Sequence, residues 1–535
     1  MTCSTPTLAP DTHPVPGAGA DAEITLREQL LDAELLVDQR DTAEDPEFSA
    51  TVQTAADRAG RGGYDAWLRH VESAAACAHP VRLQGQLYNV QPVTGQVTPR
   101  EHTSVMPDAV LYKACGNRRA AVCPACAETY RADTYQLILA GLHGGKGVPE
   151  SVQTHPCAFP TLTAPSFGLV HSTRAKNGRP RMCRPRRDPE TCPHGVELAC
   201  HRIHRDGERV LGTPLCPDCY DHDHQVVWNC FAGELWRRTM DTAKAHLAAH
   251  ARELGTPARL SFAKVAEMQT RGVAHFHALV RLDGLHPDDP DTVVPAPDGL
   301  GYHQLVDALT HAVRTTRFRT PPHPDNPDGW PIQWGRELRI LPVRLSTKGE
   351  ITETQVAGYL AKYATKATET TGHVSARITP DTAGLYADPD GNHTARLIDA
   401  CWRLGRPGSD LDPTQATRNS GRLSYLRLRR WAHMLGFGGH FSTKSRRYST
   451  TLRALREARV TWRRTRHRTA DHHDQTTEDT TLVVGLLTYA GTGWHTTGDA
   501  LLANTAAAKA REHRRVCRDE ITHQIGSVRA AVAAA

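Results

Sequence analysis

The sequence predicts an α+β fold in which helices flank an antiparallel sheet. The candidate elements between residues 159 and 368 alternate as strand, helix, strand, strand, helix, strand and helix. Two of the strands, at 259–268 and 273–282, are separated by only a short turn, as an antiparallel hairpin requires. The longest apolar run, 482–487, is far shorter than the ~20 residues that span a bilayer. We therefore expect a soluble, cytoplasmic protein with no membrane partner.

The elements before the hairpin follow from apolar periodicity and from the residues that end it. Residues 22–38 and 127–142 have the apolar spacing of helices, and two glycines directly after 143 end the second helix. Residues 159–170 begin with the residue types of a strand and turn at Pro165. A long helix is predicted over 226–254.

The elements after the hairpin complete the sheet and its helices. A loop rich in proline and aspartate occupies 284–300, and helical spacing returns at 302–317. A strand at 337–345 then precedes a helix at 353–368. In contrast, residues 174–224 are rich in Arg, Pro, His and Cys with little apolar periodicity, which indicates an insert stapled by metal.

The net charge of +6 conceals an asymmetry along the chain. Residues 1–60 carry 12 acidic residues and 3 Arg, a net −9, whereas residues 401–470 carry 17 basic and 3 acidic residues, a net +14. Such a positive field favours a nucleic acid as partner, and a merely solvated basic face is the alternative. The expected DNA contacts are Arg427, Arg429, Arg430, Lys444, Arg446 and Arg447. The aromatic residues expected to stack on unpaired bases are Tyr425, Trp431, Phe437, Phe441 and Tyr448.

Cysteine spacing predicts two structural zinc ions. The chain has 14 Cys, and two Cys-x2-Cys pairs have the spacing of thiolate knuckles. The expected ligand sets are Cys123 and Cys126 with Cys77 and Cys115, and Cys216 and Cys219 with Cys192 and Cys200. Competing donors for the second set are Cys183, His194, His201 and His204. The alternative is reduced cysteines packed as small apolar residues.

Two histidines in the run VAHFHALV indicate a cation site. Residues i and i+2 of a strand share a face, so His275 and His277 project together while Phe276 faces the other way. Two convergent imidazoles are half of a ligand set for a divalent metal ion. Two buried, hydrogen-bonded histidines are the alternative.

Two tyrosines in the final predicted helix indicate nucleophiles. Tyr359 and Tyr363 have the i, i+4 spacing that places both phenols on one helix face, flanked by Lys362 and Lys366. A phenol with a pKa near 10 is a poor nucleophile. An attacking tyrosine therefore needs a substrate polarised by a metal ion and nearby positive charge, and both are present in this sequence.

Three motifs in chain order, FPTLTAP at 159–165, HFHALV at 275–280 and YLAKYATK at 359–366, resemble those of the HUH endonucleases. They are most similar to rolling-circle replication initiators of actinobacterial plasmids. The resemblance extends to CGNRRAAVCPAC at 115–126, CPHG at 192–195, CPDCYD at 216–221 and RWAHMLGFGGHFSTKSRRYSTTL at 430–452. It implies an HUH-type sheet that acts on plasmid origin DNA, single-stranded at the nick site. Because the sequence has no Walker A loop, a host helicase and replication machinery are expected partners.

The resemblance also implies roles at the cation site. His275 and His277 would bind Mg²⁺ or Mn²⁺, with Glu267 as the third ligand and Gln269 as its rival. Thr161 and Thr163 on a neighbouring strand would support them, and two ordinary strand residues are the alternative.

For the tyrosines, the resemblance implies two successive strand transfers. Tyr363 would attack the scissile phosphate and leave a 5'-phosphotyrosine and a free 3'-OH primer, and Tyr359 would serve the transfer that ends the round. Lys362 and Lys366 would supply positive charge beside them.

The expected organisation has five segments. These are an acidic, largely disordered segment at 1–60, a zinc module at 61–150, an HUH nuclease core at 151–370 with its zinc-stapled insert at about 174–225, a basic DNA-binding region at 371–470 and a C-terminal tail at 471–535. Two other classes remain open. One is a zinc-containing DNA-binding regulator without nuclease activity. The other is a conjugative relaxase, although that class usually has three metal-binding histidines and an early tyrosine.

Overall fold

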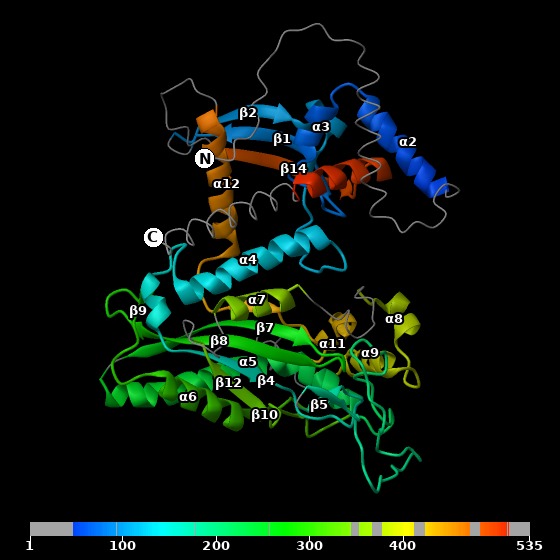
Figure 1. The fold of residues 1–535 in the computed structure, drawn as a ribbon, viewed down its shortest axis with the longest axis vertical. Coiled ribbons are helices and arrows are strands. Elements are labelled where there is room, and N and C mark those ends of the chain that lie inside the picture. The colour runs from blue at the N-terminus through cyan, green and yellow to red at the C-terminus, as the bar shows by residue number, and fades with distance from the viewer. Residues whose placement is uncertain are drawn as a thin grey trace, which may run out of the picture. The chain divides into compact units, whose positions relative to one another are not determined.

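The structure is a computed structural model in which the described residues are 46–91, 94–176, 178–255, 257–343, 353–365, 377–410, 423–470, 482–510 and 512. Within them the fold is mixed α+β with antiparallel sheets and flanking helices, as the sequence predicts. The predicted helix at 22–38 lies outside the described residues. The chain divides into a first unit, 1–128 with 473–535, and a second unit, 129–472 (Figure 1).

The first unit contains a four-stranded antiparallel sheet built around β1 (Val81–Val90). β1 pairs along its whole length with β14 (Leu482–Thr492), and its other edge pairs with β2 (Val97–His102) and β3 (Leu111–Lys113). β14 lies in the segment for which the sequence predicts only a tail. The pairing partners are between 392 and 411 residues apart in the chain, so no local pattern reveals them.

Helices from both ends of the described chain complete the first unit. α2 (Pro46–Gly60) and α3 (Tyr64–Val71) contribute buried residues to the same core as the helical stretch 497–510. The Arg58 guanidinium lies 2.8 Å from a carboxylate oxygen of Asp108 and 2.6 Å from one of Asp499. This pairing links the stretch before β1 to the stretch after β14.

The second unit is built on a six-stranded antiparallel sheet of order β12-β4-β8-β7-β13, with β9 beside β8. Its strands are β4 (Cys157–Leu162), β7 (Ala258–Met268), β8 (Ala274–Leu285), β9 (Val293–Val294), β12 (Leu338–Pro342) and β13 (Ser442–Lys444). β7 and β8 form the predicted hairpin, in which Glu267 is paired with His275 and Val265 with His277.

Helices cover both faces of this sheet (Figure 1). Phe276 and Ala278 of β8 belong to the larger core, with α5 (His222–Glu253) and α6 (Tyr302–Thr315). Leu279 belongs to the other core, with α4 (Pro124–His143) and α7 (Glu353–Tyr363). The histidines alternate with Phe276, so they lie on the face of α4 and α7.

The remaining elements surround this layered centre. They are β5 (Arg174–Lys176), β6 (Arg179–Arg181), β10 (Arg317–Arg319), β11 (Pro331–Gln333), α8 (Pro380–Tyr386), α9 (His393–Leu404), α11 (Arg427–Arg430) and α12 (Leu452–Ala470). Short 3-10 turns lie at Thr103–Val105, Pro107–Ala109, Glu150–Thr154 and Ala432–Met434. Among the described residues, no helix is both long and apolar enough to cross a membrane.

Candidate active site and metal centres

The histidine pair lies on the inner part of β8 and is shielded from solvent. His275 and His277 are 8% and 4% exposed, and their ring centroids are 4.6 Å apart. Thr161, which pairs with His277 across β4 and β8, places its hydroxyl 3.2 Å from Nδ1 of His277. The Phe159 ring stacks on the same imidazole, with the two ring centroids 5.9 Å apart. The neighbouring strand β4 therefore fixes the orientation of His277.

His275 is a buried histidine with one ring nitrogen that no other described residue satisfies. Its Nδ1 is buried and has no hydrogen-bond partner among the described residues. Burial first, and then the positive charges of His277 and Arg271, lower the pKa of His275 to about 3. The imidazole is therefore neutral at physiological pH, the form in which histidine binds metal.

Glu267 supplies the carboxylate nearest to the pair. Its Oε2 lies 3.4 Å from Nε2 of His277, and the β7–β8 register places it opposite His275. The rival ligand, Gln269, accepts a hydrogen bond from the side chain of Arg271 at 3.2 Å. The set of two imidazoles and one carboxylate fits a divalent cation. The ligand atoms of these three residues do not all lie within 4.8 Å of one another, in contrast to those of the cysteine clusters among the described residues.

Helix α7 brings both tyrosines to the histidines. Val356 and Leu360 of α7 are buried in the same core as Leu279 of β8. This packing brings the adjacent helix face, which carries Tyr359 and Tyr363, close to β8. The Tyr359 hydroxyl lies 3.2 Å from Nε2 of His277, and the Tyr359 and Tyr363 rings are 5.0 and 5.9 Å from the His277 ring. The two phenol rings are 4.7 Å apart. The i, i+4 spacing thus places both phenol rings beside His277.

Charge around the phenols is uneven. Burial first, and then the neighbouring Tyr363 and Glu267, raise the pKa of Tyr359 above its usual value. Lys362 is exposed, with its ammonium 6.0 Å from the centre of the Tyr363 ring. Lys366 lies outside the described residues.

The first expected cysteine set comes together in the first unit. The sulfurs of Cys77, Cys115, Cys123 and Cys126 lie within 4.8 Å of one another. Three Sγ–Sγ distances, Cys115–Cys126, Cys77–Cys126 and Cys77–Cys123, are 3.6, 3.7 and 3.9 Å. A zinc tetrahedron with Zn–S bonds of about 2.3 Å has edges of about 3.8 Å. All four cysteines are free of disulfides, so the cluster can hold a metal ion.

The second expected set differs from the arrangement in the structure. Cys192, Cys216 and Cys219 lie together, but His194, one of the competing donors, is their fourth member. Cys200 instead groups with His171, Cys183 and His204. His171 is absent from the sequence prediction because it lies before the predicted start of the insert at about residue 174, and it has no neighbouring donor in the chain.

Several of the expected DNA contacts have partners within the protein. Lys444 donates to the Ser449 carbonyl at 2.7 Å, and Arg429 donates to the Trp402 carbonyl at 2.7 Å. Two others pair with one carboxylate, since Asp291 lies 2.6 Å from Arg447 and 3.6 Å from Arg446. The remaining two lie on α11, where Arg427 is half-buried and Arg430 is exposed. The exposed guanidiniums of this set are those of Arg430 and Arg446.

The aromatic residues of the basic region are mostly unable to stack on bases. Tyr425, Phe437, Phe441 and Tyr448 are all buried, with at most 4% of each exposed. The expectation of base stacking therefore does not hold for these four, because they pack into the cores of the second unit. Of the five, only Trp431 is half-buried and reaches the surface.

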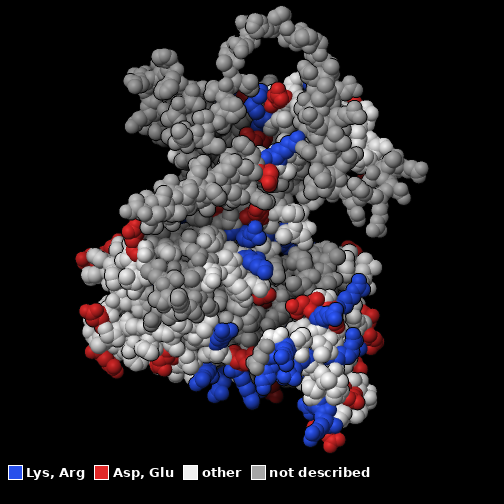
Figure 2. All heavy atoms as spheres, in the orientation of Figure 1, with Lys and Arg blue, Asp and Glu red and all other residues white. Residues whose placement is uncertain are grey.

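Exposed basic residues instead occur on two short hairpins that are not among the predicted elements. β5 and β6 carry Arg174, Lys176, Arg179 and Arg181, all exposed, and β10 carries the exposed Arg317 and Arg319. On the face shown in Figure 2, basic side chains gather near the positions of β5 and β10, with acidic side chains among them. The run RAKNGRPR at 174–181 has a basic residue at every second position on each side of Asn-Gly, and this alternation could have predicted the β5–β6 hairpin.

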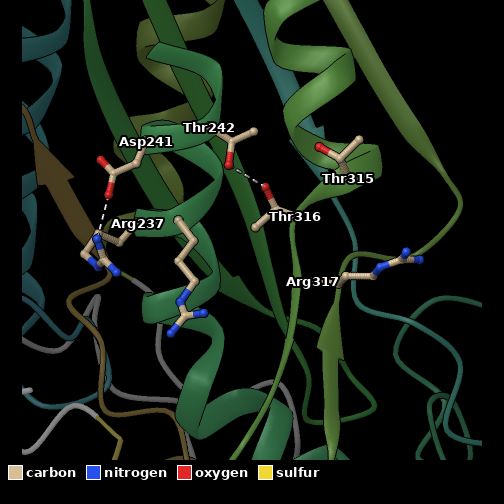
Figure 3. Close-up of a pocket in the computed structure, with 7 residues that line it drawn as sticks. Arg237, Asp241, Thr242, Thr315, Thr316 and Arg317 are labelled. Carbon is tan, nitrogen blue, oxygen red and sulfur yellow. Dashed lines mark hydrogen bonds and ion pairs between the residues drawn. The ribbon is translucent and has the colours of Figure 1, made fainter. Parts of the chain in front are cut away.

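A polar cleft of about 420 Å³ lies beside β10, between the middle of α5 and the end of α6 (Figure 3). Its walls include Arg237, Arg317 and two hydroxyls, Thr242 and Thr316, which are 3.3 Å apart. Arg237 pairs with Asp241 at 2.6 Å. Because α5 and α6 pack on the Phe276 side of the sheet, this cleft is separate from the histidines.

Comparisons with known proteins agree over most of the chain. Residues 63–508 match the RepSA family model, described as "Replication initiator protein, pSAM2". A relative from Streptomyces ambofaciens named "Replication initiator protein" is 40% identical over 471 residues, which are 86% of this chain and 94% of the relative. No solved structure matches the chain. The family match includes the histidine pair, the tyrosine helix and the cysteine clusters.

Proposed function

The chain belongs to the RepSA family of replication initiator proteins, and from that premise we propose that it starts plasmid replication by nicking one origin strand with a tyrosine. The single observation that carries the proposal is the approach of two helix-borne phenols to a buried histidine pair, with the Tyr359 hydroxyl 3.2 Å from His277. This is the chemistry of the HUH endonucleases, which the motifs of this chain resemble.

The proposed reaction conserves the energy of the phosphodiester. The phenol of Tyr363 loses its proton as its oxygen attacks the scissile phosphorus, the bond to the 3' oxygen breaks, and that oxygen takes up a proton and becomes the primer hydroxyl. The new phosphotyrosine bond retains the energy needed to rejoin the strand, so no ATP is required. Tyr359 serves the second transfer, while Lys362 offsets negative charge at the phosphate.

His275, His277 and Glu267 would hold the divalent cation, Mg²⁺ or Mn²⁺. When bound, this ion supplies a Lewis acid that polarises the phosphoryl oxygen. The observation that supports this assignment is the buried Nδ1 of His275, which has no partner among the described residues. Thr161 and Phe159 hold the His277 ring so that its Nε2 faces Glu267 and the phenols.

Zinc at the Cys77, Cys115, Cys123 and Cys126 cluster would be structural. Four thiolates leave no open position for a substrate or water molecule. The ion would tie the segment before β1 to the start of α4 within the first unit. The partners of the whole protein would be origin DNA, a host helicase and the host replication machinery, because the sequence has no motor motif of its own.

The decisive experiment is a search for a covalent adduct. Overlapping single-stranded oligonucleotides that cover both strands of the plasmid origin are incubated with the full chain and Mn²⁺, and then run on a denaturing gel. A label at the 3' end of the cleaved strand should move to the position of the protein. A label at the 5' end should appear on a shorter free oligonucleotide that a polymerase can extend.

Matched variants separate the mechanism from general DNA binding. The Tyr359→Phe, Tyr363→Phe double variant should form no adduct, whereas Tyr489→Phe, which changes an exposed phenol on β14, should retain it. His277→Ala should abolish cleavage and leave duplex binding largely intact. An undiminished adduct in the double variant would overturn the mechanism. Origin binding without an adduct on any oligonucleotide would instead favour a DNA-binding regulator.

A further inference from the structure

The insert formed by residues 171–219 has almost no apolar core. Among its described residues the buried ones are Cys183, Cys192, Cys200, His204 and Cys216, together with Gly212 and Pro214. Its regular structure is the small β5–β6 hairpin, supplemented by isolated bridges such as the one between Arg184 and Cys200. Hydrophobic burial therefore cannot account for the order of this segment, and five of its seven buried residues are potential metal ligands.

One group of four donors lies at the base of the hairpin. The ligand atoms of His171, Cys183, Cys200 and His204 lie within 4.8 Å of one another. The Cys200 sulfur is 3.4 Å from Nε2 of His204. Zn–S bonds of about 2.3 Å and Zn–N bonds of about 2.05 Å give a tetrahedral S–N edge of about 3.6 Å. The cluster thus has the size of a zinc site.

The surroundings of this group orient its members as metal ligands. Nδ1 of His204 lies 2.8 Å from a carboxylate oxygen of Glu208, which leaves Nε2 free to face Cys200. The Ser172 amide donates to the Cys183 sulfur at 3.2 Å, which holds that sulfur in place. Nδ1 of His171 is buried without a hydrogen-bond partner in the described chain. A carboxylate behind a ligating histidine is the usual support of a zinc ligand.

A second, separate group of four lies in the same insert. It consists of Cys192, His194, Cys216 and Cys219, again within 4.8 Å of one another. Nδ1 of His194 is 3.2 Å from the Cys219 sulfur and 3.7 Å from the Cys216 sulfur. The tight turn that brings Cys192 and His194 together is closed by a bond from the Gly195 amide to the Cys192 carbonyl at 2.9 Å.

We infer that the insert binds two zinc ions in an interleaved arrangement, so that the whole chain holds three structural zinc ions. In chain order the first and third ligand pairs, His171 with Cys183 and Cys200 with His204, hold one ion. The second and fourth pairs hold the other. A tetrahedral set of four thiolate and imidazole ligands favours zinc over magnesium or manganese. The inference does not depend on the nicking reaction.

The interleaving has a mechanical consequence for the basic hairpin. His171 and Cys183 lie on either side of β5 and β6, so the first ion closes the base of the hairpin that presents Arg174, Lys176, Arg179 and Arg181. The loop that carries Cys192 and His194 lies between Cys183 and Cys200, so loss of the first ion should loosen the second site as well.

The test is to count and classify the bound ions in the purified full chain. Zinc measured by mass spectrometry should be three per chain. After growth with cadmium, the ¹¹³Cd NMR spectrum should show three resonances, whose positions correspond to four, three and two thiolate ligands. Two zinc ions per chain, or two resonances both typical of four thiolates, would overturn the inference. This measurement uses the unaltered protein and no DNA.

Variants assign the ions to their sites. Cys183→Ala should lower the zinc content from three to two or fewer and remove the two-thiolate cadmium resonance. Cys157→Ala, which changes a buried cysteine outside the clusters, should leave three ions. His250→Ala should also leave three, because it alters a partly exposed group with His246 and Asp307. A fall to two zinc ions in His250→Ala would place the third ion at that surface group and contradict the inference.

Discussion

The most deeply buried charges of the second unit lie on β8, just beyond the histidine pair. Arg281 and Asp283 are both fully buried, and the Arg281 guanidinium lies 2.7 Å from the Asp283 carboxylate. His155 and Ser261 also contact that carboxylate, at 2.7 and 2.6 Å. Arg281 reaches the carbonyls of Gly141 on α4 and of Tyr448. The network therefore fixes the strand that carries the histidines against α4.

Replacing Asp283 should destabilise the second unit in a pH-dependent way. Burial alone would raise the pKa of Asp283, but hydrogen bonds from His155, Arg281 and Ser261 hold it below the usual value. Its stabilisation is therefore complete above the unfolded pKa near 4 and is lost as pH falls through the lower folded pKa. Urea unfolding should show Asp283→Asn less stable by about 3 to 5 kcal/mol at pH 7.

The difference between Asp283→Asn and the native chain should shrink as the pH falls below about 4. Asp291→Asn is the matched control, because Asp291 is an exposed carboxylate that also pairs with arginine. It should change stability by less than about 1 kcal/mol. A difference for Asp283→Asn that is the same at pH 3 as at pH 7 would contradict the assigned pKa direction.

The two tyrosines should have separable roles. Tyr363→Phe should eliminate the first covalent adduct, whereas Tyr359→Phe should still nick but fail to transfer the bound strand to a second oligonucleotide. Both activities can be followed in one assay with differently labelled donor and acceptor strands. If Tyr359→Phe instead loses the first adduct while Tyr363→Phe retains it, the two assignments are reversed.

At the scale of elements, the sequence predicts the second unit well and the first unit poorly. The predicted strands at 259–268 and 273–282 match β7 and β8 to within three residues, because each has a continuous apolar pattern and the pair is joined locally. α5 starts earlier than predicted, at an N-cap formed by Asp221, whose side chain accepts from the His224 amide at 2.9 Å. The first turn of α5 is polar, so the apolar periodicity used to predict the helix begins only after its true start.

The first sheet and the cysteine partners escape prediction for a physical reason. β2 is largely exposed, so its sequence lacks the alternation of apolar and polar residues that marks a strand. β14 pairs with β1, from which it is separated in the chain by the whole second unit. Cys-x2-Cys spacing identifies Cys123 with Cys126 and Cys216 with Cys219 because those ligands are close in the chain. In contrast, the position of Cys200 depends on a turn and a bridge to Arg184 that spacing cannot show.

Gly85 should be essential for the pairing of β1 with β14. Its φ of +145° is strained for other residues, and an added Cβ would lie against the Leu486 carbonyl oxygen. Gly85→Ala should destabilise the first unit by about 1 to 3 kcal/mol. Hydrogen exchange of the β1 and β14 amides should accelerate, while exchange in β8 stays unchanged. Gln84→Ala, an exposed change on the same strand, should have little effect.

At the scale of the whole molecule, charge is separated along the chain rather than balanced locally. Residues 1–45 carry 10 acidic residues and 2 Arg, a net −8, and they lie outside the described residues. α2, which follows them, contributes Ala55 to the first core, so a truncation that preserves the fold should end at residue 45. The acidic segment is suited to compete with DNA for basic surfaces.

Deleting residues 1–45 should raise the affinity for nonspecific duplex DNA about 3- to 10-fold at 50 mM salt, with little gain at 200 mM, because salt screens the competition. Fluorescence anisotropy with a labelled random duplex measures this change. A chain in which the ten acidic residues are replaced by Asn or Gln should gain as much as the deletion. Unchanged affinity at low salt in both forms would exclude competition by the acidic segment.

The pairing of β1 with β14 also sets an order of events during synthesis. A ribosome that adds about 5 to 20 residues per second needs roughly 20 to 80 s to travel from the end of β1 to the start of β14. During that interval the whole second unit emerges and can fold, while β1 leaves the exit tunnel with an open strand edge. The nascent chain is therefore most vulnerable to chaperone capture or aggregation at its beginning, and its first sheet is the last to close.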